Sequence, residues 1–316
     1  MPEPAPLLLL DVGGTDIKAA ATRGAGRELG PVLRRGVLPH ADPTGEALVG
    51  QLAGIAEEVL DGVRPGAAAL LIPGIVDTRA RRVLFAANLG LRDAPVPDAL
   101  QRRLGVPVAF GHDVGTAAEA ELREGAGRDG AECTLVVVIG TGIASTMFVG
   151  EARIDPPGAG ELGHVPVPGG LACPCGAHGC LETIASAAGI ARAYRALSGA
   201  SVPGASEVLD RAAAGDVHAA AAWDQAVQAL AFALHWSVGL LGVDRIIVGG
   251  GLSGAGEALL GPLRDALSAR LSYMSMPTIV RARLGGDSGL VGARRLALEL
   301  EANQAVPAAR AKEPLT

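Results

Sequence analysis

The chain has 316 residues with 27 basic and 33 acidic side chains, which gives a formal net charge of −6 at pH 7. This charge, together with the lack of a dense run of Lys or Arg, argues against a nucleic-acid surface and favours a small-molecule partner. A chain of this length exceeds what one hydrophobic core usually supports, so we expect two lobes of about 100–200 residues each.

Composition and the first residues indicate the class of protein. Hydrophobic residues make up 49% of the chain but aromatic residues only 3%, which is typical of a helix-rich α/β protein rather than an aromatic β-sandwich. The opening MPEPAPLLLLDVGG has no basic region before its apolar run, and its four leucines lead directly into Asp11. Neither a signal peptide nor a membrane span fits this pattern, so we expect a cytoplasmic protein with no membrane partner.

A strand, a glycine turn and a second strand are predicted over residues 7–23, because aliphatic runs flank Gly13-Gly14-Thr15. The same pattern returns over residues 134–150 around Gly140-Thr141-Gly142, which predicts two related halves. Periodicity predicts the other elements as follows: a helix at 44–64, a strand and turn at 68–78, a strand at 106–113, a helix at 117–126, an irregular stretch at 155–180, mostly helical structure at 183–241, a strand with a glycine turn at 244–256, and a helix near 290–300 before an irregular tail.

Three glycine turns follow predicted strands: Gly13-Gly14-Thr15 with Lys18 nearby, Gly140-Thr141-Gly142, and Gly249-Gly250-Gly251. Such turns present backbone N–H groups without side-chain bulk, which is what a phosphate group needs. Each turn alone is explained as well by a simple tight hairpin, but three together favour a nucleotide-phosphate site.

The third turn also reads G-x-G-x-x-G, ending at Gly254, which raises the alternative of a nicotinamide- or flavin-dependent oxidoreductase. That fingerprint requires an acidic residue at the end of a second strand about 20 residues further on. None stands there, so the sequence disfavours this alternative.

Two aspartates stand at the ends of predicted strands. Asp113 could accept a hydroxyl proton as the general base of a phosphoryl transfer, or it could cap the helix that follows. Asp11, beside the first glycine turn, could hold Mg²⁺ or its waters, or it could only cap the turn.

Three of the four cysteines form the pattern C-x-C-x4-C at Cys173, Cys175 and Cys180. With His164 or His178 as a fourth ligand, they would complete a closed tetrahedral Zn²⁺ site, which is structural because it leaves no open position. The alternative is three buried free thiols. Cys133 lies in a predicted buried strand and is interpreted as a core residue.

The motifs DVGGTDIK, GHDVGTAAEAE, VVVIGTGI, GAGELGH, CPCGAHGCLE and IIVGGGLS resemble, in order and spacing, those of the ROK family of sugar kinases over about residues 7–300. The resemblance implies a two-lobed α/β fold of the actin-like ATPase (ribonuclease H-like) type, with a duplicated core and a structural zinc loop at 160–182. The smaller lobe would comprise residues 1–112 with the C-terminal helix 289–316, and the larger lobe residues 113–288.

The resemblance also implies roles for individual residues. Asp113 would be the base that activates the sugar hydroxyl, and His164, rather than His178, the fourth zinc ligand beside Cys173, Cys175 and Cys180. The sugar would be bound by Gly74, Asn88, His112, Asp113, Glu161, His164 and Glu182. ATP with Mg²⁺ would be bound by Asp11, Gly13, Gly14, Thr15, Lys18, Gly140, Thr141, Gly142, Gly250 and Gly251.

The chain departs from the family pattern near the expected sugar. His112 and Gly115 replace two Asn residues that most members have, one before and one two residues after the catalytic Asp. The second phosphate hairpin reads GTGIASTMF instead of GTGIGGG, a wording nearer to that of polyphosphate-using relatives. An amino sugar, a cyclitol of secondary metabolism, or polyphosphate as the donor are therefore alternatives to glucose and ATP.

The resemblance thus predicts an ATP-dependent kinase of a sugar or sugar-like polyol, forming a homodimer or homotetramer. Regulators of the same family carry a DNA-binding segment before the kinase-like core, and here the first strand is expected to begin near Leu7. A catalytically inactive sugar-binding regulator is the non-kinase alternative. The presence of both Asp11 and Asp113 argues against it.

Overall fold

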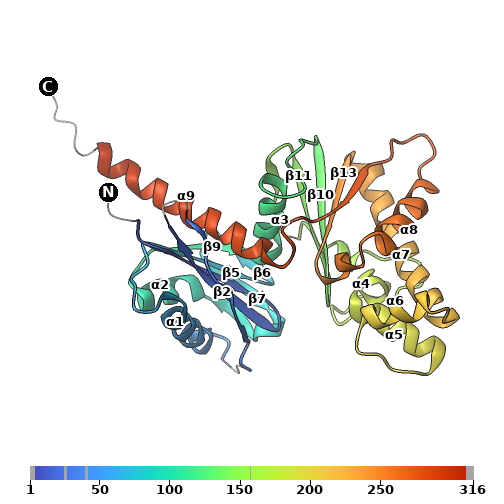
Figure 1. The fold of residues 1–316 in the computed structure, drawn as a ribbon, viewed down its shortest axis with the longest axis horizontal. Helices are drawn as coiled ribbons and strands as arrows, with labels where there is room; N and C mark the ends of the chain where they lie inside the picture. The colour runs from blue at the N-terminus through green and yellow to red at the C-terminus, as the bar shows by residue number, and fades with distance from the viewer. Residues whose placement is uncertain (1–3, 25–26, 40–41, 157, 311–316) are drawn as a thin grey trace. The chain divides into compact units, whose positions relative to one another are not determined.

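The computed structural model describes residues 4–24, 27–39, 42–156 and 158–310 (Figure 1). The chain divides into two compact units, one formed by the residues up to Ala120 and from Asp287 onward, the other by Glu121–Gly286. Both units combine helices with a mixed β-sheet, so the expected α/β class is confirmed. No helix among the described residues combines the length and apolar character needed to cross a bilayer.

The sheet of the first unit is built around two strands that are buried on both faces. Its order is β3-β2-β1-β5-β9, with β4 paired to β2. The central strand β1 is antiparallel to β2 and parallel to β5, which is parallel to β9. The bounds are β1 Leu7–Val12, β2 Asp16–Arg23, β3 Glu28–Leu29, β4 Leu33–Gly36, β5 Ala67–Ile72 and β9 Val108–His112. The unbroken apolar runs of β1 and β5 suit parallel strands covered on both sides.

Helices cover both faces of this sheet (Figure 1). Because side chains alternate along a strand, Leu8 and Leu10 pack into the cluster that includes α1 (Glu46–Leu60) and α2 (Val96–Leu104). Leu7 and Leu9 pack instead against α9 (Ser288–Arg310). The final helix is longer than expected, so the prediction of an irregular tail is wrong up to residue 310; residues 311–316 lie outside the described part.

A separate three-stranded antiparallel sheet, in the order β6-β7-β8, follows β5. Its strands are β6 Ile75–Asp77, β7 Arg82–Ala86 and β8 Leu91–Ala94, and the short 3₁₀ turn Ala87–Leu89 links the last two. The sequence predicts a turn where β6 lies and no element for β7 or β8, because these strands are short and partly exposed.

The sheet of the second unit has the order β12-β11-β10-β13-β14. Here β10 is antiparallel to β11 and parallel to β13, which is parallel to β14. The bounds are β10 Cys133–Ile139, β11 Ile143–Val149, β12 Ala152–Ile154, β13 Arg245–Gly249 and β14 Thr278–Arg281. The two sheets therefore share the same succession of a hairpin followed by two parallel neighbours.

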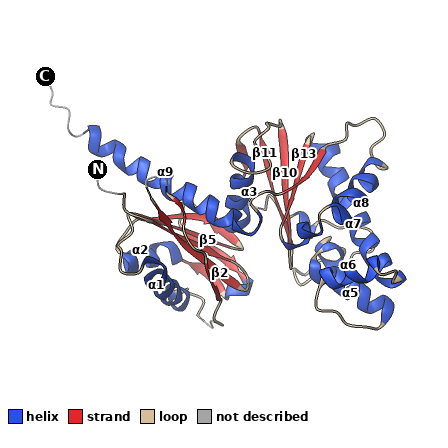
Figure 2. Cartoon of the chain, viewed as in Figure 1, coloured by secondary structure: helices blue, strands red, loops and turns tan. Residues whose placement is uncertain are grey.

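The predicted helical character of residues 183–241 is confirmed by four helices, drawn in blue in Figure 2. These are α4 Glu182–Ala185, α5 Ala187–Ser198, α6 Ala205–Ala213 and α7 Val217–Leu241, and α8 Glu257–Ser268 follows β13. Asp216 caps α7 by accepting the backbone N–H groups of His218 and Ala219. Cys133 is buried in the core of this unit, as predicted.

A buried carboxylate fixes the end of α3 (Asp113–Arg123). Glu121 accepts the backbone N–H groups of Ala126, Arg283 and Leu284 at 2.7–3.1 Å. Three N–H donors offset much of the cost of burying a charged group. The carboxylate thus ties together two segments of the second unit that adjoin its two chain boundaries.

Candidate functional site

The candidate residues of the first unit gather at the carboxyl ends of β1, β5 and β9. Asp11 lies near the end of β1, Gly74 follows β5, and Asp113 follows β9. Because the three strands are parallel neighbours, their carboxyl ends meet at one edge of the sheet. In open α/β sheets this edge is where ligands bind.

Asp11 is buried, and its Oδ2 lies 3.6 Å from the Lys18 ammonium on β2. Burial raises the pKa of this carboxyl to about 6; Lys18 opposes the rise and the nearby Asp113 adds to it. The first turn of α9 also reaches this carboxylate, because any Cβ atom at Gly289 would overlap Asp11. The sequence motifs do not indicate Gly289, since the contact joins opposite ends of the chain.

The first glycine turn follows Asp11 directly. The N–H of Gly13 donates to the carbonyl of Asp16 at 2.8 Å, which closes the turn. A Cβ atom at Gly14 would lie 3.0 Å from the side-chain nitrogen of Asn88, so these two predicted residues are neighbours. The candidate phosphate turn and a candidate sugar residue are therefore adjacent within this unit.

Asp113 is the first residue of α3, and its side chain is 21% exposed. Its Oδ1 accepts the N–H of Val114 at 2.7 Å, so the carboxylate contacts the helix start while staying accessible. Burial raises the pKa of Asp113, and the neighbouring His112 opposes that rise. A carboxyl with a raised pKa at a strand end suits a general base.

The candidate residues of the second unit gather at the carboxyl ends of its parallel strands β10 and β13. The turn of Gly140 to Gly142 follows β10, and the turn of Gly249 to Gly251 ends β13. A Cβ atom at Gly250, whose φ is +78°, would overlap the backbone of Ile139 at the end of β10. The two turns are therefore neighbours, and only glycine allows this approach.

Glu182 supports the turn after β10. Its Oε2 accepts the N–H of Ile143 at 2.8 Å, and a Cβ atom at Gly142 would lie 2.5 Å from the same oxygen. The N–H of Ala187 donates to the carbonyl of Gly140 at 2.9 Å. The predicted sugar residue Glu182 is thus directly connected to the predicted phosphate turn.

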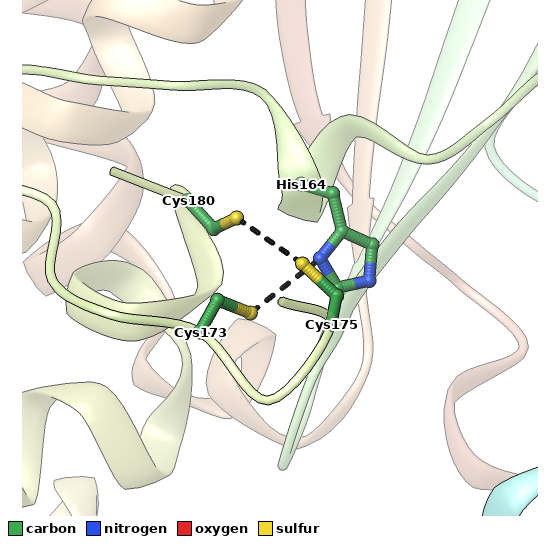
Figure 3. Close-up of side chains that lie close together, drawn as sticks. All are labelled: His164, Cys173, Cys175 and Cys180. Carbon is green, nitrogen blue, oxygen red and sulfur yellow. Dashed lines mark hydrogen bonds between the residues drawn. The ribbon is translucent and has the colours of Figure 1, made fainter. Parts of the chain in front are cut away.

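Three sulfur atoms and one imidazole nitrogen converge in the loop that contains the cysteines (Figure 3). The ligand atoms of His164, Cys173, Cys175 and Cys180 all lie within 4.8 Å of one another. Cys175 Sγ is 3.7 Å from Cys180 Sγ, and Cys173 Sγ is 3.7 Å from His164 Nδ1. A disulfide would need about 2.05 Å, whereas a zinc tetrahedron with bonds of about 2.3 Å has edges close to the observed distances.

The geometry distinguishes the two histidines that the spacing left open. His164 belongs to the cluster, whereas the backbone of His178 forms an isolated bridge with Ala172. Cys180 is fully buried, which raises its pKa to about 12, while the N–H of Ala177 lowers the pKa of the exposed Cys175. Neighbouring thiolates need a cation to be stable together, and this donor set fits zinc.

The cluster uses only one side of the His164 ring. Nδ1 faces Cys173, while Nε2 lies 3.8 Å from the carboxylate of Glu161. The loop is also attached to β11, since the N–H of Ser145 donates to the carbonyl of Gly160 at 2.7 Å. Glu161 and His164 are therefore presented from a segment held both by the sheet and by the cluster.

The family model described as the ROK family matches residues 8–300. A glucokinase of Halalkalibacterium halodurans is 32% identical over 90% of this chain and 92% of its own length. The ROK hexokinase of Thermus thermophilus is 31% identical, with a TM-score of 0.78 over 94% of this chain and 99% of that one. A ROK glucokinase of Streptomyces griseus, solved with glucose and AMPPNP, is 29% identical, with a TM-score of 0.77 over 93% of this chain and 99% of that one.

We predict that the isolated protein holds about one zinc ion per chain and that Cys175→Ser loses it. The variant should unfold at lower temperature and bind sugar more weakly, because the same loop presents Glu161 and His164. Elemental analysis, thermal unfolding and sugar titration measure the three effects. Cys133→Ala is the matched control, since this cysteine lies outside the cluster and its loss should leave the zinc content unchanged. Active wild-type protein with far less than one zinc per chain would contradict the prediction.

The pKa of Asp11 predicts a pH-dependent gain in stability for Asp11→Asn. The folded state keeps the Asp11 proton up to about pH 6, whereas the unfolded state releases it near 3.8. The contribution of Asp11 to the free energy of unfolding of the wild type therefore falls by at most about 3 kcal/mol as pH rises between those values. Asp11→Asn has no carboxyl at this position, so its free energy of unfolding does not fall in this way. The substitution also removes the negative charge that pairs with Lys18, and this makes the gain in stability smaller.

Chemical denaturation in Mg²⁺-free buffer between pH 4 and pH 8 measures this difference. The stability of Asp11→Asn relative to wild type should rise up to about pH 6 and then level off. Asp16→Asn, on the same turn but with a half-exposed side chain, is the control for removal of one negative charge. A difference that does not change with pH would refute the assignment.

Proposed function

The chain belongs to the ROK family and is an ATP-dependent sugar kinase, and we propose that Asp113 is the general base of its reaction. The observation that carries this proposal is the position of Asp113. It stands accessible at the carboxyl end of β9, at the same sheet edge as the first glycine turn, Asp11 and Lys18. A strand-end carboxylate with a raised pKa in such a grouping supports this role.

The proposed reaction needs one proton transfer and one substitution at phosphorus. A hydroxyl oxygen of the sugar forms a bond to the γ-phosphorus of ATP, and the bond from that phosphorus to the β-γ bridging oxygen breaks, which releases ADP. Asp113 takes the hydroxyl proton and later returns it to solvent. Phosphoryl transfer depends mainly on positioning and charge stabilisation, so a single base suffices.

For the nucleotide we propose the three glycine turns together with Asp11, Thr15, Lys18 and Thr141. The backbone N–H groups of the turns would bind phosphate oxygens, and Gly250 and Gly251 would lie nearest the nucleoside. Asp11 fits a hard cation, because its buried carboxylate has only one close cationic neighbour, Lys18, among the residues that the structure describes. When bound, Mg²⁺ would neutralise the charge of the phosphates.

For the sugar we propose Gly74, Asn88, His112, Glu161, His164 and Glu182 in addition to Asp113. Carboxylates accept hydrogen bonds from ring hydroxyls, and Nε2 of His164 is the ring nitrogen that the cysteine cluster does not use. We propose structural zinc at His164, Cys173, Cys175 and Cys180. Its ligands are all supplied by the chain, so the metal would hold the loop rather than take part in the reaction.

We also propose that the two sheets represent the duplicated core of an actin-like ATPase, with lobes at residues 1–112 plus 289–316 and at 113–288. The shared strand order of the two sheets supports this interpretation. A homodimer or homotetramer is supported by exposed apolar residues on α7, where Trp236 is 49% exposed and Leu240, one turn further on, is 73% exposed. Sedimentation velocity that found only monomer at micromolar concentration would exclude it.

The identity of the sugar is best decided by a substrate screen. His112 replaces an Asn that contacts the sugar in most family members, so we propose that a less common sugar or a cyclitol is preferred over glucose. Sugars, amino sugars and cyclitols should be compared by kcat/KM with ATP and Mg²⁺, and the best of them tested again with polyphosphate as the donor. Highest activity on glucose would reject the preference but not the kinase.

We predict that Asp113→Asn lowers kcat by about 10²- to 10⁴-fold, the usual contribution of a general base. An amide of the same shape cannot take the hydroxyl proton, while nucleotide binding and folding should be preserved. Steady-state kinetics on the best sugar, nucleotide titration and thermal unfolding test these points. A variant that keeps more than about a tenth of wild-type kcat would exclude the base role.

A further inference from the structure

His112 and Asp113 contact each other in a defined way at the junction of β9 and α3. Nδ1 of His112 accepts the N–H of Gly115 at 3.1 Å. Nε2 of the same ring lies 3.4 Å from Oδ1 of Asp113. The two ring nitrogens therefore have different partners, one an amide donor and the other a carboxylate.

The amide of Gly115 determines the protonation pattern of the ring. A ring nitrogen that accepts a hydrogen bond carries no proton, so in the neutral ring the proton must be on Nε2. Nε2, which then carries the proton, lies 3.4 Å from Oδ1 of Asp113. Gly115 is the third residue of α3, so His112 also fills the position of a helix N-cap, which Asn usually occupies well.

The contacts with Val114 and His112 are both made to one carboxylate oxygen. Oδ1 accepts the N–H of Val114 at 2.7 Å and lies closest to Nε2 of His112. This leaves Oδ2 as the oxygen to receive the substrate proton. A base held in this way loses less freedom when the substrate binds.

The charged groups that face Asp113 come from three strands in the described part of the chain. They are His112 on β9, Lys18 on β2 and Asp11 on β1. Lys18 already pairs with Asp11 at 3.6 Å, so its charge is shared between two carboxylates. Nε2 of His112 lies 3.4 Å from Oδ1 of Asp113, so this imidazole is a direct neighbour of the base.

We propose that His112 is a positioning residue for the general base: Gly115 fixes its Nε2–H form, and that N–H holds Asp113 with Oδ2 directed to the substrate. This inference rests on the proposed role of Asp113 and adds to it. It differs from a role of His112 in sugar recognition alone, which would change substrate preference but not the ionisation of the base.

Two substitutions of His112 test the contacts of its two ring nitrogens separately. In His112→Asn the amide oxygen can replace Nδ1 as acceptor for Gly115, but nothing replaces Nε2–H. In His112→Gln the longer side chain can place an N–H near Nε2, but the contact with Gly115 is lost. The first variant therefore tests the contact with Asp113, and the second tests the helix cap.

The pH dependence of kcat on the best sugar is the main measurement. For His112→Asn we expect the acid limb to move up by about half a unit to one unit, because the ionised base loses a donor. At one pH unit below the wild-type midpoint, kcat relative to its plateau then falls about three- to ninefold. For His112→Gln we expect the acid limb of the pH profile to stay at its wild-type position. This variant should instead unfold at a lower denaturant concentration than wild type. Superimposable pH profiles for wild type and His112→Asn, with only the sugar ranking changed, would overturn the proposal.

A second measurement does not depend on turnover. The ¹⁵N chemical shifts of the imidazole nitrogens report the tautomer directly, and the chain has only 6 histidines, so His112→Asn assigns the signal. We expect a neutral ring protonated at Nε2 in wild type and in Asp113→Asn. A ring protonated at Nδ1 would refute the positioning role even if the sugar screen found no substrate, whereas full activity of Asp113→Asn would refute the proposed function instead.

Discussion

The parallel pairing of β1, β5 and β9 is the constraint on which the first unit depends. Two of these strands are covered on both faces, so polar chemistry can be placed only where they end. Asp11, Gly74 and Asp113 occupy those ends, and the register of the sheet sets how close they lie. Burial at this edge raises the pKa of both Asp11 and Asp113, and the nearby Asp113 adds to the rise at Asp11.

In the second unit, the segment from Glu161 to Glu182 is stabilised in a different way. This segment has little regular structure, and few of its side chains are apolar and buried. The cluster of three cysteines and His164 can take the place of a hydrophobic core there, because metal binding contributes to folding free energy. Glu182, at the C-terminal end of this segment, contacts the glycine turn after β10. The conformation of the segment therefore affects the conformation of the turn.

The sequence predicts much of the fold because its main signals are local. Unbroken aliphatic runs identify β1, β5 and β10, and Gly13 and Gly140 mark the hairpins. The short strands β7 and β8 carry no comparable periodicity. Contacts between distant segments, such as Gly289 with Asp11 and Glu121 with residues 283–284, have no local signal at all. The cysteine spacing predicts the cluster but cannot choose between His164 and His178, since that depends on how the loop folds back. The roles of the individual site residues remain predictions.

The first unit is formed by two separate stretches of the chain, so it cannot fold completely until the last helix has been synthesised. The sheet face formed by Leu7, Leu9 and Leu71 is covered by α9, which is synthesised only after the whole of Glu121–Gly286. At translation rates of about 5–20 residues per second, synthesis of the second unit delays α9 by roughly ten to thirty seconds. The apolar face of the sheet stays uncovered during this time. The nascent chain therefore has a period in which the second unit can complete its core while the first cannot. During that interval the uncovered leucines favour aggregation, because transiently exposed apolar surface is prone to it.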